Sequence, residues 1–160
     1  MGARMIKLLP AFLGVLLVAG IPGAYADELN SELNNLIAIQ TIILEAQDQS
    51  LEGQIAVGEV IRNRTDDVYT HGRYSERVKQ VVRRPWQFSC WNSPLIAKLR
   101  LSRVSGKTFQ RASRAWAESE HSQLVGESTH YHADYVKPYW AKGKKPAYKI
   151  GSHLFYEGIR

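Results

Sequence analysis

The chain has 160 residues, a formal net charge of +6 and a single cysteine, Cys90. This length is enough for one domain with a hydrophobic core, and one cysteine excludes an internal disulfide. The positive charge favours an anionic partner, such as a cell-wall polymer, a membrane surface or a nucleic acid, and does not choose among them.

The first 26 residues have the layout of a secretory signal peptide. A short positive region precedes an apolar stretch over residues 8–21, and Ala24-Tyr25-Ala26 has the small-x-small pattern of a cleavage site. The apolar stretch is short for a membrane span, so an uncleaved anchor is the less favoured alternative. We therefore expect residues 27–160 to form one exported domain, periplasmic or at the cell surface, without stable membrane insertion.

Two helices are expected next. Ser31 is a candidate N-cap for a helix that runs to about Ala46, and its segment Leu36–Leu44 is apolar almost all the way round, which predicts burial. Ser50 is a candidate N-cap for a second helix over residues 51–64.

The second helix contains two glycines, Gly53 and Gly58. Each costs about 1 kcal/mol of helix propensity relative to alanine. Two such costs in one helix predict that another backbone approaches it closely. We expect this neighbour to be the first helix, because the connection between the two is short.

The rest of the chain predicts two more helices and then a small sheet. We expect a helix from Ser75 to Val82, an aromatic loop over residues 83–94, and a helix from Phe109 to about Val125 that stops at Gly126. The pattern then alternates like a strand over residues 129–133. A β-hairpin follows over residues 148–156, with Gly151-Ser152 as its two-residue turn. A helical N-terminal part followed by a small antiparallel sheet is an α+β fold.

Glu45 is the leading candidate for a chemical role. It stands at the C-terminal end of the apolar helix, where burial and the negative end of the helix dipole both disfavour the ionised carboxylate. A protonated carboxylic acid is what general acid catalysis at a glycosidic oxygen requires. The alternative is a helix-end glutamate that turns out to solvent.

Several segments together resemble the cell wall hydrolases of the spore-cortex-lytic (SleB-like) type. No single segment is decisive, but their order and spacing are specific. They are Glu45-Ala46, residues 52–64 (EGQIAVGEVIRNR), Gln87-Phe88-Ser89, residues 129–133 (THYHA) with Pro138 and Trp140, and residues 150–156 (IGSHLFY).

This resemblance implies a lysozyme-like fold, related to lytic transglycosylases, that acts on the glycan strands of peptidoglycan. It places Glu45 at the position of the catalytic acid, Ser89 where members carry a Thr or Ser near the catalytic centre, and Tyr131 in the strand that lines the groove. The chain departs from the family where members often have a Gly-Glu pair, because it has Asp48-Gln49 there. A second carboxylate at position 49 is therefore missing.

Further residues are candidates for sugar contacts. An aromatic face can stack on a sugar ring, and we expect one or two of five aromatics to do so and the others to pack in the core. The five are Trp86, Phe88, Trp91, Tyr131 and Trp140. With Gln87 and Ser89, the predicted substrate-binding set is Gln87, Phe88, Ser89, Tyr131 and Trp140.

The number of carboxylates bears on the reaction. Most glycosidases use two, whereas a lytic transglycosylase can use one, because the substrate's own 6-hydroxyl attacks the anomeric carbon. Asp48, Glu52 and Glu59 are candidates for a second acid. Each also has a structural interpretation: a loop acid, a partner of the helix dipole, and a partner of Arg62 or Asn63.

The sequence favours neither of two interpretations of Asn63 and Arg64. They are either a helix C-cap with a basic residue favoured by the dipole, or a buried polar pair that fixes the helix in place.

Three alternatives remain open at the sequence level. His130 and His132, on one strand face, could bind zinc with His153 or Asp134, as in a metal-dependent amidase or peptidase. Cys90 could act with His121, His130 or His153 in a hydrolase that cuts wall peptides, although a buried inert thiol is favoured. A basic module that only binds the wall is the third. We expect peptidoglycan as partner, with no metal, cofactor or nucleic acid. The pattern does not separate hydrolysis from transglycosylation and carries no signal for an oligomeric state.

Overall fold

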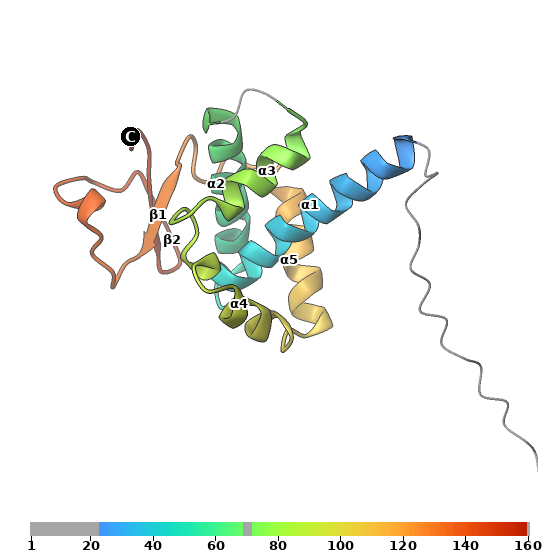
Figure 1. Cartoon of the computed structure of the whole chain (residues 1–160). Coiled ribbons are helices and arrows are strands. Elements are labelled where there is room, and N and C mark those ends of the chain that lie inside the picture. Colours follow the sequence, from blue (N-terminus) through green and yellow to red (C-terminus); the bar gives the residue numbers. More distant parts are fainter. Residues whose placement is uncertain (1–22, 69–71, 160) are drawn as a thin grey trace, which may run out of the picture.

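The computed structural model describes residues 23–68 and 72–159, in which a helical part is followed by a small sheet (Figure 1). The helices are α1 (Gly23–Ala46), α2 (Leu51–Val68), α3 (Tyr74–Arg83), α4 (Pro94–Leu101) and α5 (Gly106–Glu118). Short 3₁₀ helices lie at Ser89–Trp91 and Tyr139–Ala141, and the strands are β1 (His130–Ala133), β2 (Tyr148–Ile150) and β3 (His153–Tyr156). The predicted α+β class is confirmed. No helix among these residues is long and apolar enough to cross a membrane.

Helix α1 ends at Ala46 as predicted, and its apolar segment is buried at Ile37, Ala38, Ile42 and Ile43. It begins at Gly23 instead of at the predicted N-cap Ser31, because no helix-breaking residue lies between the two. The predicted signal peptide lies outside the described residues, except for its last four, which form the start of this helix.

Helix α2 has the predicted N-cap, since the Ser50 hydroxyl accepts a hydrogen bond from the Gly53 amide at 3.1 Å. The predicted neighbour of its glycines is wrong at Gly58. A Cβ at Gly58 would lie 2.8 Å from the Ser119 Cβ, so the close approach is made by the end of α5 and not by α1.

The helical core lies between α1, α2, α3 and α5, which bury the side chains of Ile42, Ile43, Val57, Ile61, Val78, Val82 and Trp116. Helix α3 buries its three valines, Val78, Val81 and Val82, and it begins at Tyr74, after the N-cap Arg73, instead of at the predicted Ser75. Helix α4 was not predicted. Its one signal is Pro94 at the first helical position, a place that favours proline.

Helix α5 is shorter at its C-terminal end than predicted. It begins after Ser105, whose hydroxyl accepts from the Thr108 amide, and it ends at Glu118 instead of near Val125. The reason is tertiary: the buried Glu59 carboxylate binds the backbone amides of Leu124 and Val125, which keeps them out of a helix.

The sheet has the order β1-β3-β2 and is antiparallel throughout. The predicted hairpin is confirmed, since Ile150 pairs with His153 across Gly151-Ser152, and Gly151 has a φ of +56°. Residues directly opposite each other share a face, so the pairs Tyr131–Phe155 and Ala133–His153 place Tyr131, His153 and Phe155 on one face. Phe155 packs there against Ala56 and Val60 of α2, which fixes the sheet to the helices.

Candidate active site

Three segments distant in sequence meet at the Glu45 carboxylate. Glu45 is half-buried at the last turn of α1, one residue from its end. Its Oε1 accepts a hydrogen bond from the Cys90 amide at 3.1 Å, and its Oε2 accepts one from the Tyr131 hydroxyl at 3.0 Å. The carboxylate is therefore held in one orientation by a backbone group and by a side chain of β1.

Glu45 lines a cleft of about 390 Å³ between the end of α1, the aromatic loop and β1. The cleft brings together most of the predicted site residues, namely Glu45, Gln87, Ser89, Tyr131 and Trp140. Its other lining residues are Arg64, Trp86, His132, Ala133, Tyr135, Val136, Pro138 and His153. Tyr135 and Val136 belong to a loop without a regular pattern, so no sequence signal placed them in the cleft, whereas Pro138 is part of the family resemblance.

The Tyr131 side chain faces Glu45 from the sheet and stacks on Phe155, with ring centroids 5.6 Å apart. Burial, and next the neighbouring Glu45 charge, raise the pKa of Tyr131 well above its usual value. The hydroxyl therefore keeps its proton. A neutral hydroxyl can donate to a carboxylate and accept from a carboxylic acid, so this contact suits both protonation states of Glu45.

Arg64 is buried and Asn63 is half-buried, and both bind backbone carbonyls of other segments. The C-cap interpretation is wrong, because the helix continues to Val68. The Asn63 amide donates to the carbonyl oxygens of Gly126 and Ser128 at 2.8 and 3.0 Å. The Arg64 guanidinium donates to the carbonyl oxygens of Thr129 and Gln87. Arg64 thereby ties the aromatic loop to the start of β1.

Arg64 also brings a positive charge to the floor of the cleft. Burial lowers its pKa, while the nearby Tyr131 and Glu45 raise it. Its guanidinium lies 4.6 Å above the centre of the Phe88 ring. Phe88 is only 2% exposed and does not line the cleft, so its predicted role in sugar binding is corrected to packing beneath Arg64.

Of the other four aromatic candidates, Trp86, Tyr131 and Trp140 line the cleft and Trp91 does not. Trp91 is half-buried, and its indole N–H donates to the Thr41 hydroxyl at 2.9 Å. Trp86 is 83% exposed and has a φ of +67°, a conformation that costs energy for a bulky residue. Trp140 meets His130, His132 and Tyr156 edge-on.

The three other carboxylates considered for catalysis lie outside the cleft lining. Asp48 and Glu52 are exposed. Glu59 is 3% exposed and accepts from the amides of Leu124 and Val125, at 3.0 Å each, instead of from the predicted Arg62 or Asn63. Both of its oxygens are therefore used by the backbone.

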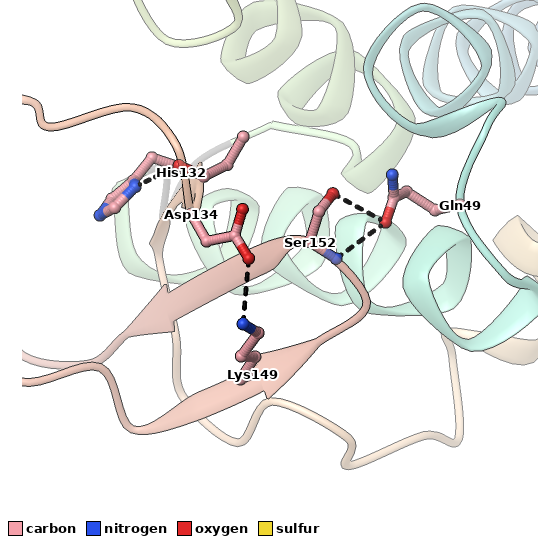
Figure 2. Close-up of polar contacts among 6 residues, drawn as sticks. Gln49, His132, Asp134, Lys149 and Ser152 are labelled. Atoms are coloured by element: carbon pink, nitrogen blue, oxygen red, sulfur yellow. Dashed lines mark hydrogen bonds and ion pairs between the residues drawn. The ribbon is translucent and has the colours of Figure 1, made fainter.

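Gln49, which stands where the resemblance leads us to expect a carboxylate, has a structural contact. The Gln49 side-chain oxygen accepts from the amide and the hydroxyl of Ser152, each at 3.2 Å, as Figure 2 shows. The glutamine thus joins the α1–α2 connection to the hairpin turn. A carboxylate could accept the same two bonds, so glutamine and glutamate suit this connection equally.

The histidines do not form the zinc cluster that the sequence left open as an alternative. The register places His153 on the opposite face of the sheet from His130 and His132, and Asp134 pairs with Lys149 at 2.9 Å (Figure 2). The His132 Nε2 contacts the Tyr156 hydroxyl at 2.8 Å. Within residues 23–68 and 72–159, no three His, Cys, Asp or Glu side chains are grouped to hold a metal ion.

His153 is a cleft residue that the sequence indicated only as an alternative zinc ligand or as a partner of Cys90. It is 6% exposed, its ring lies 5.2 Å from that of Tyr131, and its buried Nδ1 has no hydrogen-bond partner. Burial lowers its pKa, against the opposing charges of Glu45 and Asp48. A neutral imidazole therefore lies behind Tyr131.

Cys90 contributes its backbone amide and not its thiol. Burial, with the neighbouring Glu45 charge, raises the pKa of the Cys90 thiol far above its usual value. A thiol that stays protonated is a poor nucleophile. His121, one of the partners considered for it, is exposed after the end of α5. The geometry therefore favours the inert-thiol interpretation over the Cys–His hydrolase.

Comparisons with known proteins identify a family and a fold. Residues 48–156 match the family model described as Cell Wall Hydrolase. The chain is similar to the crystal structure of the catalytic domain of the Bacillus cereus SleB protein, with 22% identity and a TM-score of 0.57 over 79% of this chain and 89% of that chain. It is also similar to the catalytic domain of the germination-specific lytic transglycosylase SleB from Bacillus anthracis, with 21% identity and a TM-score of 0.58 over 84% of this chain and 98% of that one. A search of curated proteins finds no match. The expected SleB-like fold is confirmed, whereas residue roles at these identities rest on the geometry of this chain.

Proposed function

The chain belongs to the cell wall hydrolase family, and on this premise we propose that it cleaves the glycan strands of peptidoglycan as a lytic transglycosylase, with Glu45 as the single general acid and base. The similarity to a SleB domain described as a germination-specific lytic transglycosylase supports the reaction class. Glu45 lies three residues before the range that matches the family, so its role is argued from the cleft itself.

One observation carries the proposal: Glu45 is the sole carboxylate among the described residues that line the cleft. A hydrolytic glycosidase of the usual kind needs a second carboxylate as nucleophile or as base for water. The other candidates, Asp48, Glu52 and Glu59, are exposed or fully used by the backbone. A mechanism with one carboxylate therefore fits this cleft.

In the proposed reaction, protonated Glu45 gives its proton to the glycosidic oxygen as the bond to the anomeric carbon breaks. The 6-hydroxyl of the same sugar attacks that carbon and loses its proton to the Glu45 carboxylate. The product is a 1,6-anhydro sugar, no water is consumed, and Glu45 ends the cycle protonated. The Cys90 amide and the Tyr131 hydroxyl keep the carboxyl group aimed at the cleft throughout.

The remaining cleft residues supply substrate contacts in this proposal. Trp86 and Trp140 offer aromatic faces and edges to sugar rings, and the Gln87 and Ser89 side chains offer hydrogen bonds at the rim. Ser89 is exposed, as a residue that contacts bound glycan must be in the free enzyme.

We further infer that residues 1–26 are a signal peptide that directs export, which places residues 27–160 in the periplasm or at the cell surface, with access to the wall.

Mass spectrometry of the soluble products released from purified peptidoglycan tests the proposal. Wild type should release anhydro-muropeptides, and Glu45→Gln should release none while unfolding at the same urea concentration. Asp48→Asn and Glu52→Gln are matched controls that remove exposed carboxylates, and both should release wild-type products. Reducing-end muropeptides would mean hydrolysis and a second carboxylate, and activity retained by Glu45→Gln would overturn the assignment.

A further inference from the structure

Helix α4 presents an unusual surface, because its large apolar side chains point outward. Leu95 is 78% exposed, Ile96 57% and Leu99 52%, whereas the small Ala97 is buried. A helix of a soluble domain normally directs its leucines to the core. Three large exposed apolar residues within two turns are therefore a candidate interaction surface.

Helix α4 is amphipathic, but its large apolar residues face solvent instead of the core. At about 100° per residue, Leu95, Leu99 and Ile96 fall within an arc of about 100°, and Ala97 lies on the other side. Lys98 and Arg100 flank this arc, one on each side. An apolar stripe between cations matches the boundary between lipid tails and headgroups.

The charge around this helix is strongly one-sided. No Asp or Glu occurs between Glu76 and Glu118, a stretch that carries ten of the 21 Lys and Arg residues. Some of these cations have partners; Arg100, for example, donates to the Leu44 carbonyl oxygen at 2.6 Å. Lys98, Arg103 and Lys107 are exposed, and among the described residues they form no ion pair.

Helix α4 is also closely connected to the cleft. It begins three residues after the 3₁₀ helix Ser89–Trp91. The first residue of that 3₁₀ helix lines the cleft, and the amide of its second, Cys90, donates to Glu45. Arg100 attaches α4 to the carbonyl of Leu44, the residue before Glu45. A surface that bound α4 would therefore hold the cleft at a set distance from itself.

We propose that α4 docks the protein on an anionic phospholipid surface, with Leu95, Ile96 and Leu99 in the interfacial layer and Lys98, Arg103 and Lys107 on lipid phosphates. A soluble polyanion would use the cations but leave the apolar stripe in water. A second copy would bring the same basic stretch against itself. An anionic bilayer satisfies both the apolar and the charged groups, and eight helical residues are too few to span it.

The test places an environment-sensitive fluorophore on α4 of the full chain. In a Cys90→Ser background, the fluorophore is attached to Leu95→Cys. Leu33→Cys carries the same fluorophore as the matched control, because Leu33 lies on α1 and is 54% exposed in the wild type. Vesicles of phosphatidylcholine mixed with phosphatidylglycerol should shift the emission of the α4 label to the blue, and high salt should reverse the shift. Vesicles of phosphatidylcholine alone should not produce it. The readout is independent of catalysis, so it stands or falls separately from the proposed reaction.

A charge variant sharpens the test. Replacement of Lys98, Arg103 and Lys107 by Gln should raise the anionic lipid concentration for half-maximal shift by about tenfold or more. Replacement of the exposed Lys142, Lys144 and Lys145 by Gln should change it by about twofold or less. The proposal is overturned if the α4 label does not shift, if both labels shift equally, if the shift follows protein concentration without vesicles, or if soluble polyphosphate produces it.

Discussion

Two hollows lined by the described residues contain a glutamate that is at least half-buried, and the smaller of the two is the proposed active site. The larger hollow, about 630 Å³, is lined by residues of α2 and α5 that include Glu59, Arg62 and Trp116. The cleft with Glu45, about 390 Å³, shares no lining residue with it. Volume alone therefore does not single out the proposed site.

The difference lies in how the charged groups are used. Glu59 accepts two backbone amides, and Arg62 is held by the Ser119 hydroxyl and the Trp116 carbonyl at 2.9 Å each, with its guanidinium 3.9 Å above the Trp116 ring. These groups stabilise the fold and have little left to offer a substrate. Glu45 instead faces aromatic side chains and a neutral hydroxyl that can accept as well as donate.

Exchanging the two carboxylates for amides should give opposite results, which is the strongest test of this comparison. Glu45→Gln should abolish product release and leave stability within about 1 kcal/mol of wild type. Glu59→Gln should lower the free energy of unfolding by about 2–4 kcal/mol, because an amide NH₂ group would face one of the two backbone donors. Urea unfolding measures the second effect, and the exposed Glu52→Gln is its control. A Glu59→Gln variant as stable as this control would contradict the structural role given to Glu59.

Tyr131→Phe tests the hydroxyl beside Glu45. Loss of a hydrogen bond to a charged group is worth about 1.5–3 kcal/mol, so kcat/KM should fall by about tenfold to a hundredfold. The fall should be in kcat, since the hydroxyl orients the acid and does not hold the glycan. Tyr135, another cleft residue, is 82% exposed, and Tyr135→Phe should keep more than half of the activity. Equal activities of the two variants would contradict the role given to Tyr131.

His130 of strand β1, next to the cleft, should lower the stability of the protein in acid. Burial, and next the charge of Arg64, lower the pKa of His130 from 6.5 to about 4. The unfolded chain then binds the proton more tightly, so this contribution is complete above pH 6.5 and is lost as the pH falls toward 4. The full shift corresponds to about 3 kcal/mol, and screening at this half-exposed site reduces it to about 1 kcal/mol.

Urea unfolding of wild type and His130→Gln between pH 7 and 4 measures the His130 contribution. It is the difference between the two proteins in how the free energy of unfolding changes with pH. The variant should lose about 1 kcal/mol less than wild type over that range. Parallel curves would mean that His130 does not titrate differently in the folded and unfolded chains.

The smallest effect is expected at the surface ion pair of α5. Arg114 and Glu118 meet at 2.6 Å, with side chains 66% and 39% exposed. Such a pair is worth about 0.5 kcal/mol or less, so Arg114→Gln should leave both stability and product release nearly unchanged. A larger loss would show that charges outside the two hollows carry more of the fold than their exposure implies.

Much of the fold followed from local patterns. The apolar segment before Glu45, the Ser50 cap and the Gly151-Ser152 hairpin are each read from neighbouring residues, and all three are confirmed. Local patterns failed where distant groups intervene. The helix of residues 106–118 stops short of Val125 because Glu59, 65 and 66 residues earlier, binds the amides of Leu124 and Val125.

The features of the candidate site also divide into those read from local patterns and those set by contacts between distant segments. By itself, the sequence determined that an apolar helix ends in a glutamate and that a Tyr stands on a strand after the helices, since periodicity and burial are local properties. Only the tertiary structure decided that Tyr131 and the Cys90 amide meet on Glu45, that Phe88 packs under Arg64, and that His153 lies across the sheet from His130 and His132. Contacts between distant segments depend on how helices and strands pack, and the spacing of residues along the chain does not contain that geometry.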